Sequence, residues 1–128
     1  MPKKIFIIDD NKIVRDLVHR YLESRLEYIV CSEAVDGLDA IHHAREVDPD
    51  LIILDVSMPR LNGLDAAVIL HEMLPRVPII LYTLHKNIVS PKRSQAAGIR
   101  AVVSKTDPID VLVGEVANYA SVARTANA

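Results

Sequence analysis

Five polar residues that follow short apolar runs of the sequence could together carry out phosphoryl chemistry. They are Asp9, Asp10, Asp55, Thr83 and Lys105. Phosphoryl transfer onto a protein needs a carboxylate nucleophile, cations that neutralise the phosphoryl oxygens and a hydroxyl that can donate a hydrogen bond. The five residues supply carboxylates, one ammonium and one hydroxyl. Lys105 suits the fixed cation, because an ammonium binds phosphate as a point charge.

The aspartates also indicate a metal ion. Packing Asp9, Asp10 and Asp55 together would raise the pKa of at least one of them unless a counter-charge were present. A hard divalent cation removes that repulsion, and Mg²⁺ prefers a few carboxylates together with waters and phosphate oxygens. Any one aspartate after a strand could instead simply cap the next helix. The convergence of all of them on one place favours a magnesium site.

These residues can meet only if the apolar runs before them are strands of one sheet. The runs lie at residues 5–8, 28–31, 51–54, 78–82 and 101–103. Each is apolar without alternation, which is typical of strands buried on both faces of a parallel sheet. Ligands bind outside the carboxyl ends of the strands in such sheets. Four of the five strands would therefore deliver a polar side chain to one edge.

Helical patterns fill the stretches between the runs. Apolar residues recur at three- and four-residue steps over residues 13–24, 38–47, 64–74 and 109–120. A weaker helix is expected to begin late, with Ser90 as N-cap and Pro91 at its first position, and to end at Gly98. The order predicts an α/β fold of five βα units, with a doubly wound, five-stranded parallel sheet in three α/β/α layers.

Composition limits the class of protein. The chain has 15 basic and 17 acidic residues and a net charge of −2, which argues against a strongly basic nucleic-acid binder. Its single cysteine, Cys31, suits a reducing cytosol. The apolar run before Asp9 is too short for a signal peptide or a membrane span. We expect a cytoplasmic single domain over residues 1–128, with an ordered core at 3–122, a frayed tail at 123–128, and no membrane or direct nucleic-acid contact.

The polar residues belong to longer motifs that match a known family. The motifs are Ile-Ile-Asp9-Asp10, Ala34-Val-Asp-Gly37, Leu-Asp55-Val-Ser-Met-Pro59, Leu-Asn-Gly63, Thr83, Ala-Gly98 and Lys105. Over essentially its whole length the sequence resembles the receiver domain of two-component response regulators, the phosphoacceptor partners of histidine kinases. The resemblance implies the flavodoxin-like strand order 2-1-3-4-5, which chemotaxis regulators of this family share.

The resemblance also implies the roles of the acidic residues. Asp55 would accept a phosphoryl group from a phosphohistidine on a sensor histidine kinase or a phosphotransfer protein. Asp10 would bind Mg²⁺ directly and Asp9 mostly through water, while Asp55 and the backbone carbonyl of Ser57 would complete the protein ligands. Such a receiver catalyses its own phosphotransfer and dephosphorylation and is not a conventional turnover enzyme.

The remaining roles concern the response to phosphorylation. Lys105 would pair with Asp55 and then with the phosphoryl oxygens, and Thr83 would turn inward to bond the phosphoryl group. The change would reach the surface formed by the fourth helix, the fifth strand and the fifth helix, which could also support a homodimer. The downstream protein target is not identified by the sequence.

Four positions depart from the family pattern, one of them Thr106, which follows Lys105 where proline is usual. Leu84 follows the hydroxyl residue where a small side chain is usual, and it either narrows access to the acceptor or points into solvent or the fourth helix and changes little. Val102 replaces the usual tyrosine or phenylalanine, so an aromatic switch is absent or carried by another residue. Pro91 either marks a late helix start, with a long loop over residues 84–89, or kinks a longer helix.

Other functions remain as alternatives. A degenerate receiver would act as an interaction module without phosphorylation, and the bulky Leu84 keeps that alternative open. A phosphatase or mutase of the haloacid-dehalogenase type would need an acid where Ser57 stands. A nucleotide binder would need a glycine- or hydroxyl-rich loop where Asp9, Asp10 and Asn11 stand. The adjacent His42 and His43 lack the spacing of helical metal ligands and indicate a solvated helix face.

Overall fold

A parallel sheet forms the centre of the computed structural model, which describes residues 2–25, 27–57, 61–84 and 90–120. Its five strands have the order β2-β1-β3-β4-β5, as the resemblance implied. They are β1 (Lys3–Ile8), β2 (Tyr28–Ala34), β3 (Leu51–Leu54), β4 (Ile79–Thr83) and β5 (Ile99–Ser104). The predicted fold class is confirmed.

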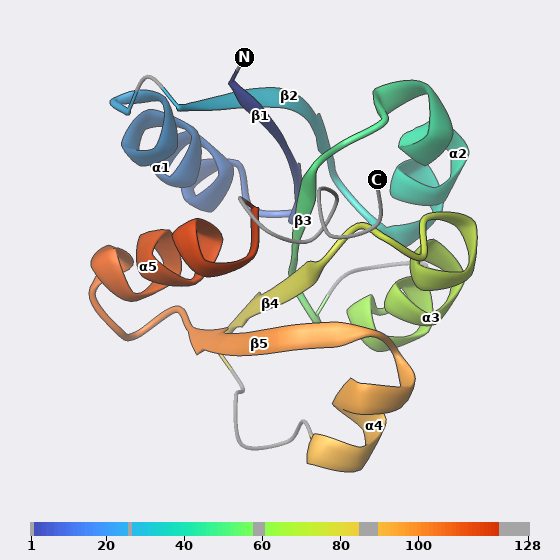
Figure 1. Cartoon of the computed structure of the whole chain (residues 1–128). Helices are drawn as coiled ribbons and strands as arrows, with labels where there is room; N and C mark the ends of the chain where they lie inside the picture. The colour runs from blue at the N-terminus through green and yellow to red at the C-terminus, as the bar shows by residue number, and fades with distance from the viewer. Residues whose placement is uncertain (1, 26, 58–60, 85–89, 121–128) are drawn as a thin grey trace.

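Helices cover both faces of this sheet. In Figure 1, α1 (Lys12–Glu23) and α5 (Ile109–Ala120) lie together on one face, and α2 (Gly37–Val47) and α3 (Gly63–Met73) lie on the other. The remaining helix, α4 (Pro91–Ala96), packs beside the edge strand β5. The predicted three-layer α/β/α arrangement is therefore confirmed.

Burial explains why the two edge strands are longer than their apolar runs. Every residue of β3 and β4 is buried. The edge strands β2 and β5 are only partly buried and tolerate polar residues such as Ser32 and Arg100. As a result β2 continues past Cys31 to Ala34, and β5 extends on both sides of the predicted run at 101–103.

Alternation along the strands divides the apolar side chains into two cores. Ile5 and Ile7 pack with residues of α1 and α5, whereas Phe6 and Ile8 pack with residues of α2 and α3. Successive side chains of a strand point to opposite faces of the sheet, so a strand that separates two helical layers must be apolar at both parities. This is why the sequence shows unbroken apolar runs.

The helix α4 differs from the others in length and burial. Its N-cap is Ser90, whose Oγ accepts a hydrogen bond from the Arg93 backbone N–H at 3.1 Å, and Pro91 is its first residue. The late start predicted for this helix is thus confirmed. It has six residues, and none of them is buried.

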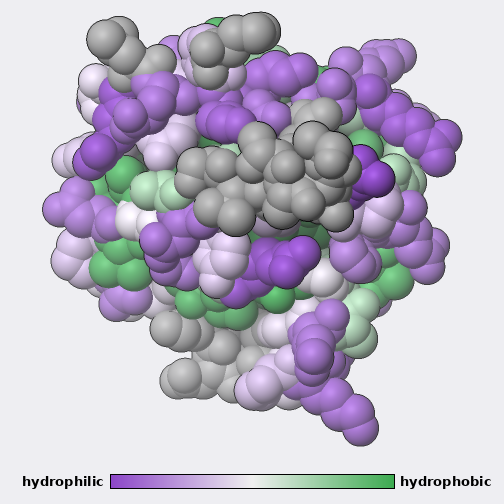
Figure 2. All heavy atoms as spheres, in the orientation of Figure 1, coloured by the Kyte–Doolittle hydropathy of each residue, from purple (hydrophilic) through white to green (hydrophobic). Residues whose placement is uncertain are grey.

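The surface of the molecule is mostly polar on the face that Figure 2 shows. Hydrophobic residues show there as smaller areas between the hydrophilic ones. Within the described residues, no helix combines the length and the apolar character that crossing a membrane requires. Most of the long loop expected at 84–89 and the tail expected at 123–128 lie outside the described residues.

Gly98 joins α4 to β5 in a conformation that favours glycine. Its φ is +73°, and its backbone N–H donates to the Gln95 carbonyl at 3.1 Å. A Cβ at this position would also collide with the imidazole ring of His71 on α3. Glycine is therefore required both by the left-handed backbone and by the close approach of α3.

Replacing Gly98 should separate these two requirements. We expect Gly98→Ala to lower the free energy of unfolding by more than about 2 kcal/mol, because the left-handed conformation and the overpacking each contribute about 1 kcal/mol or more. In a His71→Ala background only the backbone contribution should remain. Urea denaturation followed by circular dichroism measures both.

A matched control is Gly114→Ala in α5, where a Cβ would meet nothing within 4 Å. That substitution should be neutral or stabilising by up to about 1 kcal/mol, since alanine favours helix. An equal effect of Gly98→Ala in both backgrounds would show that His71 does not restrict the site.

Candidate functional site

Three charged side chains leave the sheet at the carboxyl ends of separate strands. Asp9 follows β1, Asp55 follows β3 and Lys105 follows β5, each one residue after the strand ends. The residue two positions before each belongs to the core shared with α1 and α5. Because strand side chains alternate with a period of two, all three continue toward the same face of the sheet.

The ammonium of Lys105 lies between two buried carboxylates. Its Nζ is 2.7 Å from Asp9 Oδ2 and 3.4 Å from Asp55 Oδ2. The side chains of Asp9, Asp55 and Lys105 are 4%, 6% and 10% exposed. Lys105 therefore bridges both acids, with its shorter contact to Asp9 and not to Asp55, the partner that the resemblance implied.

Asp10 brings a third carboxylate to the same place. One carboxylate oxygen from each of Asp9, Asp10 and Asp55 lies within 4.8 Å of the other two, and Asp10 is exposed. Three carboxylates and one ammonium leave a net charge of −2 in this cluster. Hard oxygen donors with a charge of −2 and one side open to solvent fit a Mg²⁺ ion, which keeps several of its waters.

Burial and repulsion both act on Asp55. Desolvation raises the pKa of Asp55 above its ordinary value, and the charge of Asp9 raises it further. Lys105 and the Ser57 backbone N–H, which donates to Asp55 Oδ1 at 3.4 Å, act in the opposite direction without cancelling that rise. A bound cation would relieve this repulsion, as predicted for clustered aspartates.

Backbone hydrogen bonds extend the sheet to the functional residues. The N–H of Asp9 donates to the Ala34 carbonyl at 3.0 Å, that of Asp55 to the Ile8 carbonyl at 3.0 Å, and that of Lys105 to the Thr83 carbonyl at 2.8 Å. Each charged residue is thus fixed by the strand next to its own. Rigid strand ends position such groups more accurately than loops would.

Gly63 holds the start of α3 against the acceptor residue. Its N–H donates to the Val56 carbonyl at 2.8 Å, and a Cβ there would collide with the Asp55 carbonyl oxygen. The sequence showed Gly63 as part of a motif without a role. Its role is to let the helix reach the Asp55–Val56 backbone.

The other predicted residues lie around the acidic cluster. Thr83 is completely buried, and its strand parity is that of Leu81, which packs in the core shared with α2 and α3. Ser57 is exposed next to the cluster. Leu84 is 62% exposed, which favours the alternative in which its side chain points into solvent.

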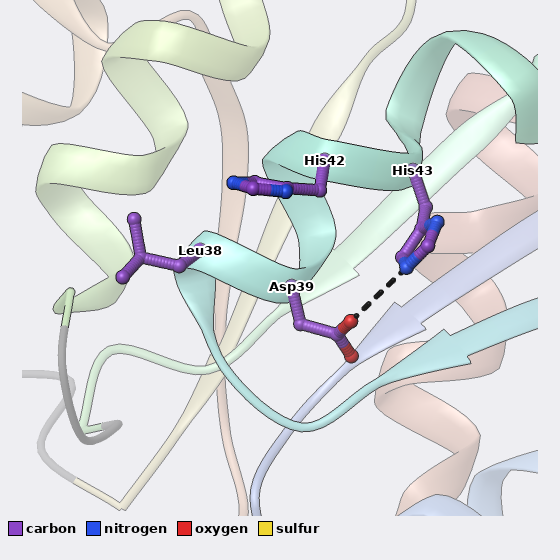
Figure 3. Close-up of a pocket in the computed structure, with 4 residues that line it drawn as sticks. All are labelled: Leu38, Asp39, His42 and His43. Atoms are coloured by element: carbon purple, nitrogen blue, oxygen red, sulfur yellow. Dashed lines mark ion pairs between the residues drawn. The ribbon is translucent and has the colours of Figure 1, made fainter.

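The histidine pair of α2 does not belong to the acidic cluster. Leu38, Asp39, His42 and His43 line a surface pocket, in which the two histidines point in different directions (Figure 3). His43 Nε2 lies 3.3 Å from Asp39 Oδ1. Among the described residues, the group of acids and imidazoles close enough to hold a metal is Asp9, Asp10 and Asp55. The solvated helix face predicted for the histidines agrees with this geometry.

Two neighbours of the cluster were not predicted from the sequence. The backbone N–H of Asn11 donates to Asp9 Oδ1 at 2.9 Å, and Arg15 Nη1 donates to the Asp9 carbonyl at 2.6 Å. The Asn11 side chain also caps α1. Asn11 is a typical N-cap residue, but nothing in the helical pattern indicates where the guanidinium of Arg15 points.

Comparison with known proteins agrees with this geometry. The family model of the response regulator receiver domain matches residues 5–117. A protein-glutamate methylesterase/protein-glutamine glutaminase of Pyrococcus horikoshii is 40% identical over 78 residues, which are 61% of this chain and 21% of that protein. The response regulator protein VraR of Staphylococcus saprophyticus is 30% identical over 106 residues, 83% of this chain and 51% of that protein.

Solved structures share the fold. A two-component response regulator of the LuxR family from Aurantimonas superimposes with a TM-score of 0.87 at 26% identity, covering 94% of this chain and 86% of that one. The chain thus spans between about a fifth and about half of the length of the curated relatives described above.

Removing the Asp55 charge should stabilise the fold without metal. We expect Asp55→Asn to increase the free energy of unfolding at neutral pH, because folding desolvates the Asp55 carboxylate and sets it against Asp9. The raised pKa of Asp55 means that its protonated form stabilises the fold below the unfolded pKa of about 3.9, and that this contribution is lost as the pH rises through the folded pKa.

The stability gap between the variant and the wild type should therefore widen with rising pH over that window and narrow when Mg²⁺ is added. Urea denaturation at several pH values, followed by circular dichroism, measures it. An Asp55→Asn variant that is less stable than the wild type in metal-free buffer would contradict the electrostatic account.

Proposed function

This chain belongs to the response regulator receiver family of two-component systems, and on that premise we propose that Asp55 accepts a phosphoryl group in a Mg²⁺-dependent reaction. The donor is a phosphohistidine on a sensor histidine kinase or a phosphotransfer protein. The observation that carries the proposal is the position of the Asp55 carboxylate, 3.4 Å from the Lys105 ammonium and within 4.8 Å of carboxylate oxygens of Asp9 and Asp10.

The reaction forms one bond and breaks one. A carboxylate oxygen of Asp55 attacks phosphorus, the P–N bond of the phosphohistidine breaks, and its electron pair remains on the imidazole nitrogen. Lys105, which contacts Asp55, would bind a phosphoryl oxygen as the negatively charged group approaches. Asp9, Asp10, Asp55 and the Ser57 carbonyl would hold Mg²⁺, which supplies charge neutralisation for the phosphoryl oxygens.

The response would begin at β4. The backbone carbonyl of Thr83 accepts a hydrogen bond from the N–H of Lys105, so Thr83 is the neighbour of a cluster residue across the sheet. Its side chain has the strand parity of Leu81, in the core shared with α2 and α3. Turning toward the phosphoryl group would bring its O–H into hydrogen-bond reach and vacate a buried position on β4. Val102 provides no aromatic ring to follow Thr83, so the change would pass through the backbone to the surface of α4, β5 and α5.

The same proposal defines the partners. The α4, β5 and α5 surface would bind a downstream protein or a second copy of the chain, and the domain would work in the cytoplasm. It would catalyse its own phosphorylation and dephosphorylation without turning over a separate substrate. The competing interpretation as a non-phosphorylated receiver depended on Leu84, and the exposure of that side chain weakens it.

Phosphorylation can be tested with a small donor. Incubation with acetyl phosphate and Mg²⁺ should add one phosphoryl group to the wild type, seen as an intact-mass increase, and chelation of the metal should reduce the yield to background. Asp55→Asn should remain unmodified, because the amide is not a nucleophile. Asp65→Asn, at an exposed position in α3, is the matched control and should react like the wild type. Equal modification of Asp55→Asn and the wild type would exclude Asp55 as the acceptor.

Metal binding can be tested separately from phosphorylation. Asp10→Ala should weaken Mg²⁺ binding about tenfold or more, because it removes one of three carboxylate ligands. Asp16→Asn removes a carboxylate at an exposed position of α1 and should leave the affinity unchanged. Titration calorimetry gives both constants, and undiminished affinity in Asp10→Ala would remove Asp10 from the metal site.

A further inference from the structure

Arg15 joins the acidic cluster to the edge of the sheet. From the first half of α1, its Nη1 donates a hydrogen bond to the Asp9 carbonyl at 2.6 Å, and its Nε forms an ion pair with Glu33 Oε1 on β2 at 3.0 Å. The side chain is 13% exposed. The guanidinium is therefore held at two points and largely shielded from water. Two of its N–H donors, which lie in one plane, bind different acceptors at the same time.

The carbonyl that Arg15 binds belongs to the peptide group between Asp9 and Asp10. That group is planar, so fixing its oxygen fixes the direction in which the Asp10 Cα leaves. The preceding N–H of Asp9 is already held by Ala34 at 3.0 Å. The N–H of Asp9 is thus held by β2 and its carbonyl by Arg15, so the backbone of Asp9 is restrained on both sides of its Cα.

Asp10 depends on this restraint more than the other two acids. Asp9 and Asp55 are buried and contact Lys105. Asp10 is exposed, and within the described part of the chain no hydrogen bond or ion pair is made by its carboxylate. The backbone therefore sets the direction of its Cα–Cβ bond, from which the carboxylate reaches the other two.

Glu33 keeps the positive charge of Arg15 in place. A guanidinium released near the cluster would compete with a cation for the carboxylates of Asp9 and Asp10. The second oxygen of Glu33 lies 3.2 Å from His19 Nδ1, so Glu33 is itself held between two residues of α1. Its negative charge offsets the positive charge of Arg15.

We propose that Arg15 is a positioning residue for the metal site: it fixes the Asp9–Asp10 peptide so that the Asp10 carboxylate meets those of Asp9 and Asp55, and Glu33 holds it there. The proposal rests on the Mg²⁺ site of the proposed function, and it adds a residue that touches neither the metal nor the phosphoryl group. Residues of this kind commonly change metal affinity by about tenfold or more.

The direction of the effect distinguishes positioning from simple charge. If Arg15 acted only as a nearby positive charge, removing it would strengthen Mg²⁺ binding by reducing repulsion. If Arg15 positions Asp10, removing it weakens binding despite the lost repulsion. The two interpretations therefore predict changes of opposite sign.

The test is a Mg²⁺ titration of the whole chain by calorimetry, with the backbone amide of Asp10 followed by NMR. Arg15→Gln should weaken binding about tenfold and change the metal-free amide shift of Asp10. Arg20→Gln removes the same charge from an exposed position of the same helix and should leave affinity and shift unchanged. Arg15→Lys keeps the charge without the planar two-point contact and should fall between Arg15→Gln and the wild type. Glu33→Gln should also weaken binding.

The outcomes separate this proposal from the proposed function. If Arg15→Gln binds Mg²⁺ as tightly as Arg20→Gln or more tightly, Arg15 does not position the site, while a large loss in Asp10→Ala still supports the site itself. If the wild type and Asp10→Ala both fail to bind Mg²⁺, the metal site and the role of Arg15 fall together. Circular dichroism verifies folding, and if Arg15→Gln does not fold, a wild-type affinity in Arg15→Lys and Glu33→Gln overturns the proposal.

Discussion

Repulsion between buried carboxylates is the constraint on which the rest of this structure depends. The sheet removes Asp9 and Asp55 from water and places them within reach of each other. An isolated arrangement of that kind would be strongly unfavourable, because charges taken out of water need a partner. Lys105 supplies part of the compensation, and the cluster still carries excess negative charge. A site that is electrostatically incomplete in this way is ready to bind a cation.

The fold delivers this arrangement through strand length and parity. Three strands each end one residue before a charged side chain, and the ladder of backbone hydrogen bonds continues for that one further residue. A shift of one residue in any of these strands would turn the charged group toward the opposite core. Because the central strands are apolar on both faces, their pattern alone does not set this register. The charged residues at the strand ends oppose a shift, since it would carry a charge into an apolar core.

Much of the architecture could be predicted from the sequence because its signals are local. The apolar runs identified β3 and β4, and the Ser90–Pro91 pair gave the late start of α4. The edge strands have a weaker apolar signal in the sequence, because positions of β2 that face water need no apolar side chain. For this reason the end of β2 at Ala34 was not predicted. Arg15 and Gly63 act through contacts that depend on how α1 and α3 are placed against the sheet. No spacing rule along the chain encodes such contacts, whereas the acidic cluster could be foreseen from strand ends alone.

The small size of α4 has a consequence for its local stability. A helix of six residues that buries none of its side chains contributes little to either core. Local opening of such a segment would need far less free energy than global unfolding of the five-stranded sheet. A change of a few kcal/mol in the free energy of the acidic cluster would then be enough to shift the conformational equilibrium of α4. A rearrangement of α4 would therefore leave the sheet and its two cores intact.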